Sequence, residues 1–100
     1  MKALPPGLKP YKKTPEFTRA SIPAGLLRRH NTKAGVWAQI VILEGSMTYR
    51  ILEPEVEEIP LDTHRWGVIE PEILHEVVPG EGLRFYVEFY RAEGDEAGSL

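Results

Sequence analysis

Two histidines, His30 and His75, are the residues of this chain best suited to chemistry in a shared site. A neutral imidazole can bind a divalent metal such as Zn, Ni, Fe or Mn, and a protonated imidazole can hold an anion near neutral pH. Two ligands alone hold a metal weakly, so a metal site would need a third donor, for which Glu70, Glu88 or Gln39 is available. The two histidines are therefore candidate metal ligands, with structural, hydrogen-bonded imidazoles as the alternative.

Aromatic and charged side chains elsewhere in the chain could complete a ligand pocket. Tyr49, Tyr86 and Tyr90 each offer a hydroxyl on an apolar body. The basic residues Arg28-Arg29 and Lys33 could select an anion near the mouth of such a pocket, or they could form an exposed basic loop. The predicted ligand-binding residues are His30, His75, Tyr49, Tyr86 and Glu88.

The chain lacks the residues of several common catalytic sites. It contains no cysteine, which excludes disulfides, thiolate nucleophiles and cysteine-ligated zinc. It also has no serine nucleophile elbow of the hydrolase type and no glycine-rich loop that opens a helix and could cradle a phosphate. Any enzymatic activity would therefore depend on the histidines.

The elements that must position these residues are predicted to be short β-strands. Residues 36–43 are rich in β-branched and aromatic side chains and apolar on both faces, which is typical of a strand covered on both sides. Glu44-Gly45-Ser46 is predicted to form a turn in which Gly45 takes a positive φ. Residues 21–30 are interpreted as a turn that leads into a strand, and the other predicted strands are 11–17, 47–52, 56–61, 66–69, 75–78 and 83–91.

Seven or eight short strands with turn signals between them, and no alternating helices, indicate a single all-β domain of the sandwich or barrel type. Residues 1–10 contain three prolines and a glycine, and we expect them to form an extended lead-in. Residues 11–91 would then form the β-barrel, and residues 92–100 a flexible tail.

Composition and charge limit the class of partner. The chain is 42% hydrophobic and 27% charged, with a formal net charge of −3, which gives no attraction to nucleic acid or to an anionic membrane. No apolar run approaches the roughly 20 residues that span a bilayer, and the N-terminus lacks the apolar core of a signal peptide. We therefore expect a soluble, cytoplasmic protein that binds a small molecule or an anion.

Two stretches of the chain have a related layout: Val41-Ile-Leu-Glu-Gly45, and Gly67-Val-Ile-Glu-Pro71 followed by His75. They resemble the two motifs of the cupin barrels, which point histidines and one glutamate inward to hold a metal. Here Ala38 stands in the glutamate position, and only His30 lies near the positions of the paired histidines. The resemblance thus implies the fold more strongly than it implies metal chemistry.

A more specific resemblance covers roughly residues 11–91 and is carried by Tyr11-Lys-Lys-Thr-Pro-Glu-Phe17, His30-Asn-Thr-Lys-Ala-Gly-Val-Trp37, Glu44-Gly-Ser-Met-Thr-Tyr-Arg-Ile51, His75-Glu-Val77 and Phe85-Tyr-Val-Glu-Phe-Tyr-Arg91. These segments resemble the small cupin-like domain at the N-terminus of tellurite-resistance methyltransferases of the TehB-like family, which also occurs free-standing. The resemblance implies a cupin-like double-stranded β-helix, a small jelly-roll barrel, and it maps any shared binding site onto His30 and His75. It does not imply methyl transfer.

The function expected from these observations is a binding module for a small ligand or one divalent metal ion, related to tellurite or oxyanion stress. A metal-dependent enzyme, such as a dioxygenase, isomerase or lyase, is one alternative. A structural or interaction domain with inert histidines is another. The apolar faces of residues 36–43 suggest burial by a partner, so we also expect a homodimer.

Overall fold

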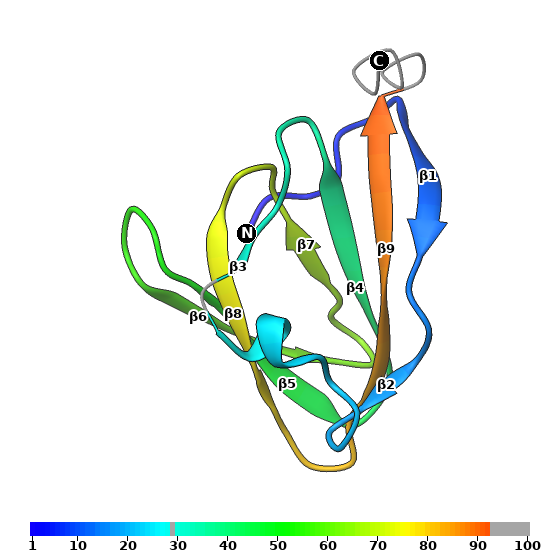
Figure 1. Ribbon diagram of the computed structural model, residues 1–100, viewed down its shortest axis with the longest axis vertical. Coiled ribbons are helices and arrows are strands. Elements are labelled where there is room, and N and C mark those ends of the chain that lie inside the picture. The colour runs from blue at the N-terminus through cyan, green and yellow to red at the C-terminus, as the bar shows by residue number, and fades with distance from the viewer. Residues whose placement is uncertain (29, 93–100) are drawn as a thin grey trace.

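The strands of this chain form two antiparallel sheets that pack face to face, as shown by the computed structural model, which describes residues 1–28 and 30–92 (Figure 1). The first sheet has the order β1-β9-β4-β7, with β2 also paired to β9, and the second has the order β3-β8-β5-β6. The prediction of an all-β domain is confirmed. The elements are β1 (Leu8–Lys13), β2 (Phe17–Thr18), the 3-10 helix η1 (Ala24–Leu27), β3 (His30–Asn31), β4 (Trp37–Glu44), β5 (Ser46–Ile51), β6 (Glu57–Asp62), β7 (Gly67–Ile69), β8 (Leu74–Pro79) and β9 (Arg84–Ala92).

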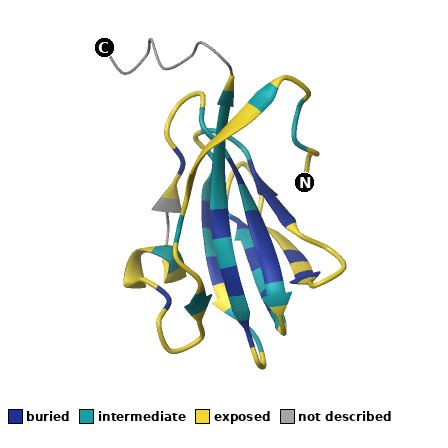
Figure 2. Ribbon diagram, turned by 90° about the vertical axis from the view of Figure 1, so that its right-hand side faces the viewer, coloured by how far each residue is buried: buried dark blue, intermediate teal, exposed yellow. Residues whose placement is uncertain are grey.

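Alternation along the strands decides which side chains form the core. Successive side chains of a strand point to opposite faces, so every second residue faces the other sheet. In β9 these residues are Phe85 and Val87, and in β5 they are Met47, Tyr49 and Ile51. Figure 2 shows the buried residues gathered in the central strands, while the connecting loops and the edge strand β1 are mostly exposed. The core is therefore one apolar layer shared by the two sheets.

The turn between β4 and β5 packs tightly against the loop between β8 and β9. Gly45 has a φ of +73°, which confirms the predicted positive φ. A Cβ atom at Gly45 would lie 2.4 Å from the backbone oxygen of Glu81, so the turn excludes any side chain there. The backbone N–H of Gly80 donates to the Ser46 carbonyl oxygen at 2.9 Å. These contacts hold the ends of the two sheets together.

The edge strands β6 and β7 close one side of the sandwich. A Cβ atom at Gly67 would lie only 2.7 Å from Cδ1 of Leu61, which shows how closely the two strands approach. The N-terminus covers the same side: Met1 Sδ accepts a hydrogen bond from Val68 N–H at 3.1 Å, and the Met1 amino group lies 3.6 Å from Glu57. On the opposite side, where β1 and β3 are the edge strands, the segment from β2 through η1 to β3 connects the two sheets.

Element boundaries differ from the predicted ones mainly in the first third of the chain. β1 begins at Leu8, because the long strand β9 extends to Ala92 and pairs with it there. The last three residues of the predicted lead-in therefore belong to the sheet. Pro10 is tolerated because β1 is an edge strand. Part of the predicted turn before β3 is the 3-10 helix η1, and residues 93–100 of the predicted tail lie outside the described residues.

Within residues 1–28 and 30–92, no helix has the length and hydrophobicity required to cross a membrane.

Candidate functional site

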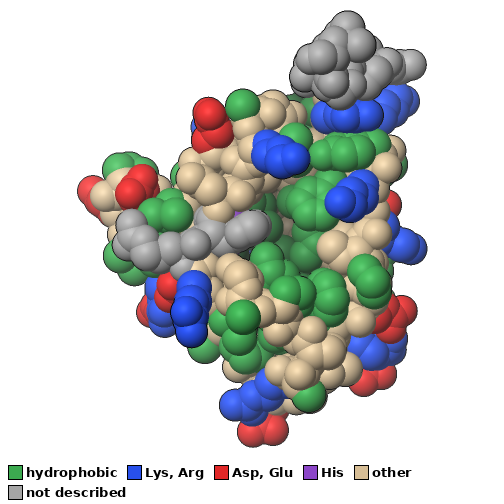
Figure 3. Space-filling model, viewed as in Figure 1, with side chains coloured by type: hydrophobic (Ala, Val, Ile, Leu, Met, Phe, Trp, Pro, Cys, Tyr) green, Lys and Arg blue, Asp and Glu red, His purple; other side chains and the backbone are tan. Residues whose placement is uncertain are grey.

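A cavity of about 420 Å³ lies between the two sheets on the side where β1 and β3 are the edge strands. Figure 3 shows hydrophobic side chains gathered in a hollow on the face that Figure 1 presents. β4 and β9 form one wall of the cavity, and β8, η1 and the chain around β3 form the other. The apolar lining includes Phe17, Leu26, Val36, Ala38, Val87 and Phe89.

His75 is a buried polar residue that also lines this cavity. It lies on β8 with only 1% of its surface exposed, and its Nδ1 atom is 2.9 Å from the Ile73 carbonyl oxygen. Since a carbonyl oxygen only accepts hydrogen bonds, Nδ1 carries a proton. An imidazole that is neutral and protonated at Nδ1 has its lone pair on Nε2, and this form can accept a hydrogen bond or bind a metal.

The second histidine, His30, lies on the neighbouring strand. His30 of β3 is directly opposite His75 of β8 in the antiparallel register. The side chain of His30 lies outside the part of the chain that the structure describes. The shared site of the two imidazoles stays a prediction, and what the structure adds is that the two backbones are neighbours in one sheet.

Tyr49 lies behind His75 and does not line the cavity. Its ring meets the imidazole edge-on, with ring centroids 5.6 Å apart and an interplanar angle of 67°. Burial raises the pKa of the Tyr49 phenol, and the negative charges of Glu70 and Glu57 raise it further. The phenol therefore stays neutral at physiological pH and gives the imidazole an uncharged aromatic support.

Tyr86 and Glu88 lie on the outer face of β9, away from the cavity. The Lys13 ammonium sits 4.9 Å from the centroid of the Tyr86 ring, and the Tyr90 hydroxyl donates to Glu88 at 3.1 Å. The cavity is lined instead by Val87, which lies between Tyr86 and Glu88 and points to the opposite face. The structure therefore does not bring Tyr86 and Glu88 together with His75.

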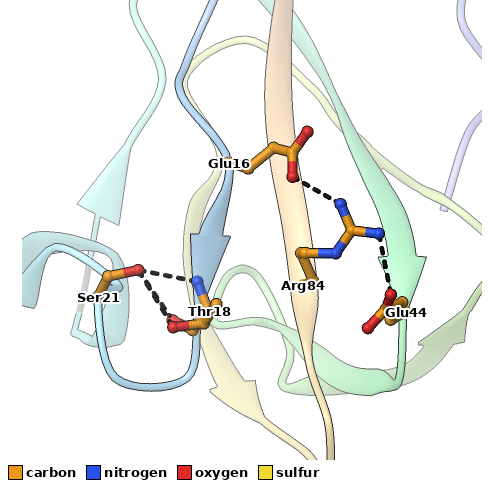
Figure 4. Close-up of polar contacts among 5 residues, drawn as sticks. All are labelled: Glu16, Thr18, Ser21, Glu44 and Arg84. Carbon is orange, nitrogen blue, oxygen red and sulfur yellow. Dashed lines mark hydrogen bonds and ion pairs between the residues drawn. The ribbon is translucent and has the colours of Figure 1, made fainter.

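The segment that carries Phe17 was not predicted as part of a site. Ion pairs attach it to the first sheet: Arg84 of β9 donates to Glu16 at 2.6 Å and to Glu44 of β4 at 3.0 Å (Figure 4). The Phe17 ring packs against Phe85, with centroids 5.7 Å apart. These contacts hold Phe17 at one edge of the cavity.

A polar turn leads from this segment to the 3-10 helix. The Thr18 N–H donates to Ser21 Oγ at 2.8 Å (Figure 4). The Ser21 N–H donates in turn to the Thr18 carbonyl oxygen at 3.0 Å. The turn reverses the chain and places Leu26 of η1 on the cavity wall. The sequence reveals a turn of this kind from its serine and threonine residues. It does not reveal that the turn places Leu26 on the wall of a cavity.

The described residues contain no group of three or more histidine, cysteine, aspartate or glutamate side chains that could hold a metal ion. Ala38, which the resemblance to the cupin motifs places at the glutamate position, lines the cavity with a methyl group that cannot bind a metal. Within the described part of the chain, the arrangement is therefore that of an apolar pocket with one buried imidazole.

Comparisons with known proteins agree on one family. Residues 12–87 match the TehB-like domain. The probable S-adenosyl-L-methionine-dependent methyltransferase TehB of Haemophilus influenzae is 28% identical over 71 residues, a match that covers 67% of this chain and 25% of that protein. The crystal structure of TehB from the same organism superposes with a TM-score of 0.83 at 25% identity, over 94% of this chain and 35% of that chain.

A protein from E. coli (strain K12) has the same fold over its whole length. Its crystal structure superposes with a TM-score of 0.82 at 23% identity, covering 92% of this chain and 98% of that one. By contrast, the chain spans about a quarter of the length of the curated methyltransferase. The match to the domain at residues 12–87 includes most of the residues that line the cavity, and this chain belongs to the TehB-like domain family.

Proposed function

We propose that this domain is a small-ligand binding module whose ligand occupies the cavity between the two sheets. The single observation that carries the proposal is a cavity of about 420 Å³ with apolar walls and the buried His75 in one of them. Ligand pockets in proteins have volumes of roughly 300–1,000 Å³ and combine apolar walls with a few fixed polar groups. The apolar walls would supply affinity through burial, and the imidazole would orient the ligand.

A cupin-like jelly-roll barrel is the finer description that we propose for the fold. Its support is that two antiparallel sheets enclose the cavity, and that Ala38 and His75 both line it. These two residues stand at positions from which the cupin motifs hold a metal. In this domain the same positions would contact an organic ligand.

The resemblance to tellurite-resistance proteins suggests a role in oxyanion stress, and we propose that the ligand itself is an organic molecule. A small, strongly hydrated oxyanion gains nothing from apolar walls and would lose its hydration there. The activity in the name of the TehB methyltransferase belongs to a protein about four times the length of the match. The proposal therefore concerns the cavity alone.

The test measures the melting temperature of the protein with octanol as a neutral apolar probe. Octanol at about ten times its Kd is expected to raise the Tm of the unmodified protein by roughly 5 °C. Val36→Trp, which fills the mouth of the cavity, should abolish this shift. Val78→Trp, at an exposed position of β8 outside the cavity, is the matched control and should retain it. Equal shifts in both variants, or no shift in the unmodified protein, would contradict the proposal.

A second experiment tests whether the protein binds the divalent metal ion expected from the two histidines. Equilibrium dialysis against zinc would measure metal stoichiometry in the unmodified protein and in His75→Gln, with circular dichroism to confirm that the variant is folded. A one-to-one zinc site that is lost in the variant would favour the metal-dependent enzyme over the binding module. If the unmodified protein binds no zinc at equilibrium, the result would support an organic ligand over a metal.

A further inference from the structure

The charged side chains among the described residues that line the cavity, those of Lys12 and Lys33, are positive. Lys12 and Lys33 both line the cavity, and among the described lining residues there is no aspartate or glutamate. Neither lysine belongs to an ion pair within the part of the chain that the structure describes. This local excess runs against the net charge of −3 for the whole chain. A cleft lined by charge of one sign attracts ligands of the opposite sign.

A bulge in β1 directs Lys12 toward the cavity. The register with β9 pairs Pro10 with Tyr90 and Lys12 with Phe89, so Tyr11 is an extra residue between the two pairs. Such an extra residue redirects the side chains beside it. Both Tyr11 and Lys12 line the cavity as a result, while Lys13 lies on the other face above Tyr86.

Lys33 reaches the mouth from the opposite wall. It follows β3 in a loop that two backbone hydrogen bonds define: Val36 N–H donates to the Lys33 carbonyl oxygen at 3.1 Å, and Glu72 N–H donates to the Thr32 carbonyl oxygen at 2.9 Å. Thr32 is itself buried. Lys12 thus comes from the edge strand β1 and Lys33 from the loop between β3 and β4, and both line the same cavity.

Below the lysines the lining is mainly apolar. Val87, Phe89 and Ala38 form the wall on the side of the first sheet, and His75 lies in the opposite wall. We infer that the cavity selects an organic anion with an apolar body, whose head group lies between Lys12 and Lys33 and whose body extends along Val87 and Phe89. This inference rests on the proposed function, and it adds the charge and the orientation of the ligand.

The experiment compares three probes with the same body and different head groups: octanoate, octanol and octylammonium. By calorimetry, octanoate is expected to bind about fivefold more tightly than octanol, as two exposed ion pairs allow, and octylammonium more weakly than either. The preference should decrease when sodium chloride is raised, because salt screens exposed charges.

Two variants test whether Lys12 and Lys33 cause the preference for octanoate over octanol. The double variant Lys12→Gln with Lys33→Gln should bind octanoate and octanol equally. Lys13→Gln is the matched control on the same strand but the opposite face, and it should keep the full preference. Equal affinities for octanoate and octanol in the unmodified protein would overturn the inference and leave the proposed function standing. Failure of all three probes to bind would overturn both, and a preference that survives in the double variant would overturn the inference.

Discussion

His75 and Tyr49 are the two polar aromatic side chains at the centre of the molecule. Both have 1% of their surface exposed, and each restricts the other through an edge-on ring contact. The hydrogen bond from His75 Nδ1 to the Ile73 carbonyl oxygen fixes the orientation of the imidazole ring. A pocket residue held in this way loses little rotational freedom when a ligand binds.

The buried phenol of Tyr49 predicts a loss of stability at alkaline pH. Tyr49 has its pKa raised above the usual 10.0 by burial, so above about pH 10 the unfolded chain releases this proton while the folded chain retains it. The free energy of unfolding should therefore fall as the pH rises, by about 1 kcal/mol from this residue between pH 10 and 11. Urea unfolding at several pH values should show this fall reduced in Tyr49→Phe.

The control for that series is Tyr86→Phe, which removes a hydroxyl from the outer face of β9. It leaves Tyr49 intact, so the alkaline fall from Tyr49 should remain. Parallel profiles for Tyr49→Phe and the unmodified protein would show that the Tyr49 phenol does not contribute.

At the level of elements, the register of the strands and the tight turns determine the shape of the cavity. β9 contacts three other strands of its sheet, and the bulge in β1 is the irregularity that brings Lys12 inward. At the far end, the Gly45 turn and the loop from Pro79 to Leu83 press together without room for a side chain at Gly45. A change in either turn would alter how the two sheets meet.

A side chain added at such a turn lowers stability through backbone strain at a positive φ and through overlap with neighbouring atoms. Comparing Gly45 with Gly82 separates these two effects. Both glycines have a positive φ, of +73° and +64°, but an added Cβ would meet the Glu81 backbone only at Gly45 and has open space at Gly82. We expect Gly82→Ala to lower the free energy of unfolding by about 1 kcal/mol, from backbone strain alone. Gly45→Ala should lower it by about 2–4 kcal/mol, because strain and overlap combine. Urea denaturation measures both, and equal costs would contradict the close approach.

At the level of the whole molecule, the outer faces of the two sheets differ in character. The outer face of the second sheet carries Arg50 between Glu58 and Glu76, in ion pairs with both. The outer face of the first sheet carries Trp37 and Tyr90, which lie directly opposite each other on β4 and β9. The first sheet is the better surface for a second copy of the chain. Aromatic residues are enriched at protein–protein interfaces, and charged residues are depleted at the cores of such interfaces.

The homodimer stays a prediction, and the first sheet is where we expect it to form. Light scattering at micromolar concentration should give twice the chain mass of 11.3 kDa. Trp37→Gln should shift the population to monomer, because it removes the largest apolar side chain of this face. Trp66→Gln, at a residue that is 43% exposed and precedes β7, is the matched control and should remain dimeric. A monomer of the unmodified protein would remove the expectation.

Much of the fold could be predicted from local sequence signals. The strand at residues 36–43, the positive φ at Gly45 and the all-β class follow from side-chain type and turn chemistry, which act over a few residues. The site was predicted less well. Tyr86 and Glu88 were chosen by residue type, and they lie on the face of β9 that turns away from the cavity.

The physical reason is that a polar side chain on a strand reaches a cavity only if its face of the strand turns inward. In β9 the period of two places Phe85, Val87 and Phe89 on one face and Tyr86, Glu88 and Tyr90 on the other, and the apolar face is the one that lines the cavity. The sequence by itself determined the all-β class, most of the strands and the turn at Gly45, because these follow from side-chain type and local turn chemistry. Tertiary structure alone decided that β1 bulges at Tyr11, that Lys12 and Lys33 line the same cavity, and that the N-terminus covers the opposite side, since each depends on contacts between residues far apart in the chain.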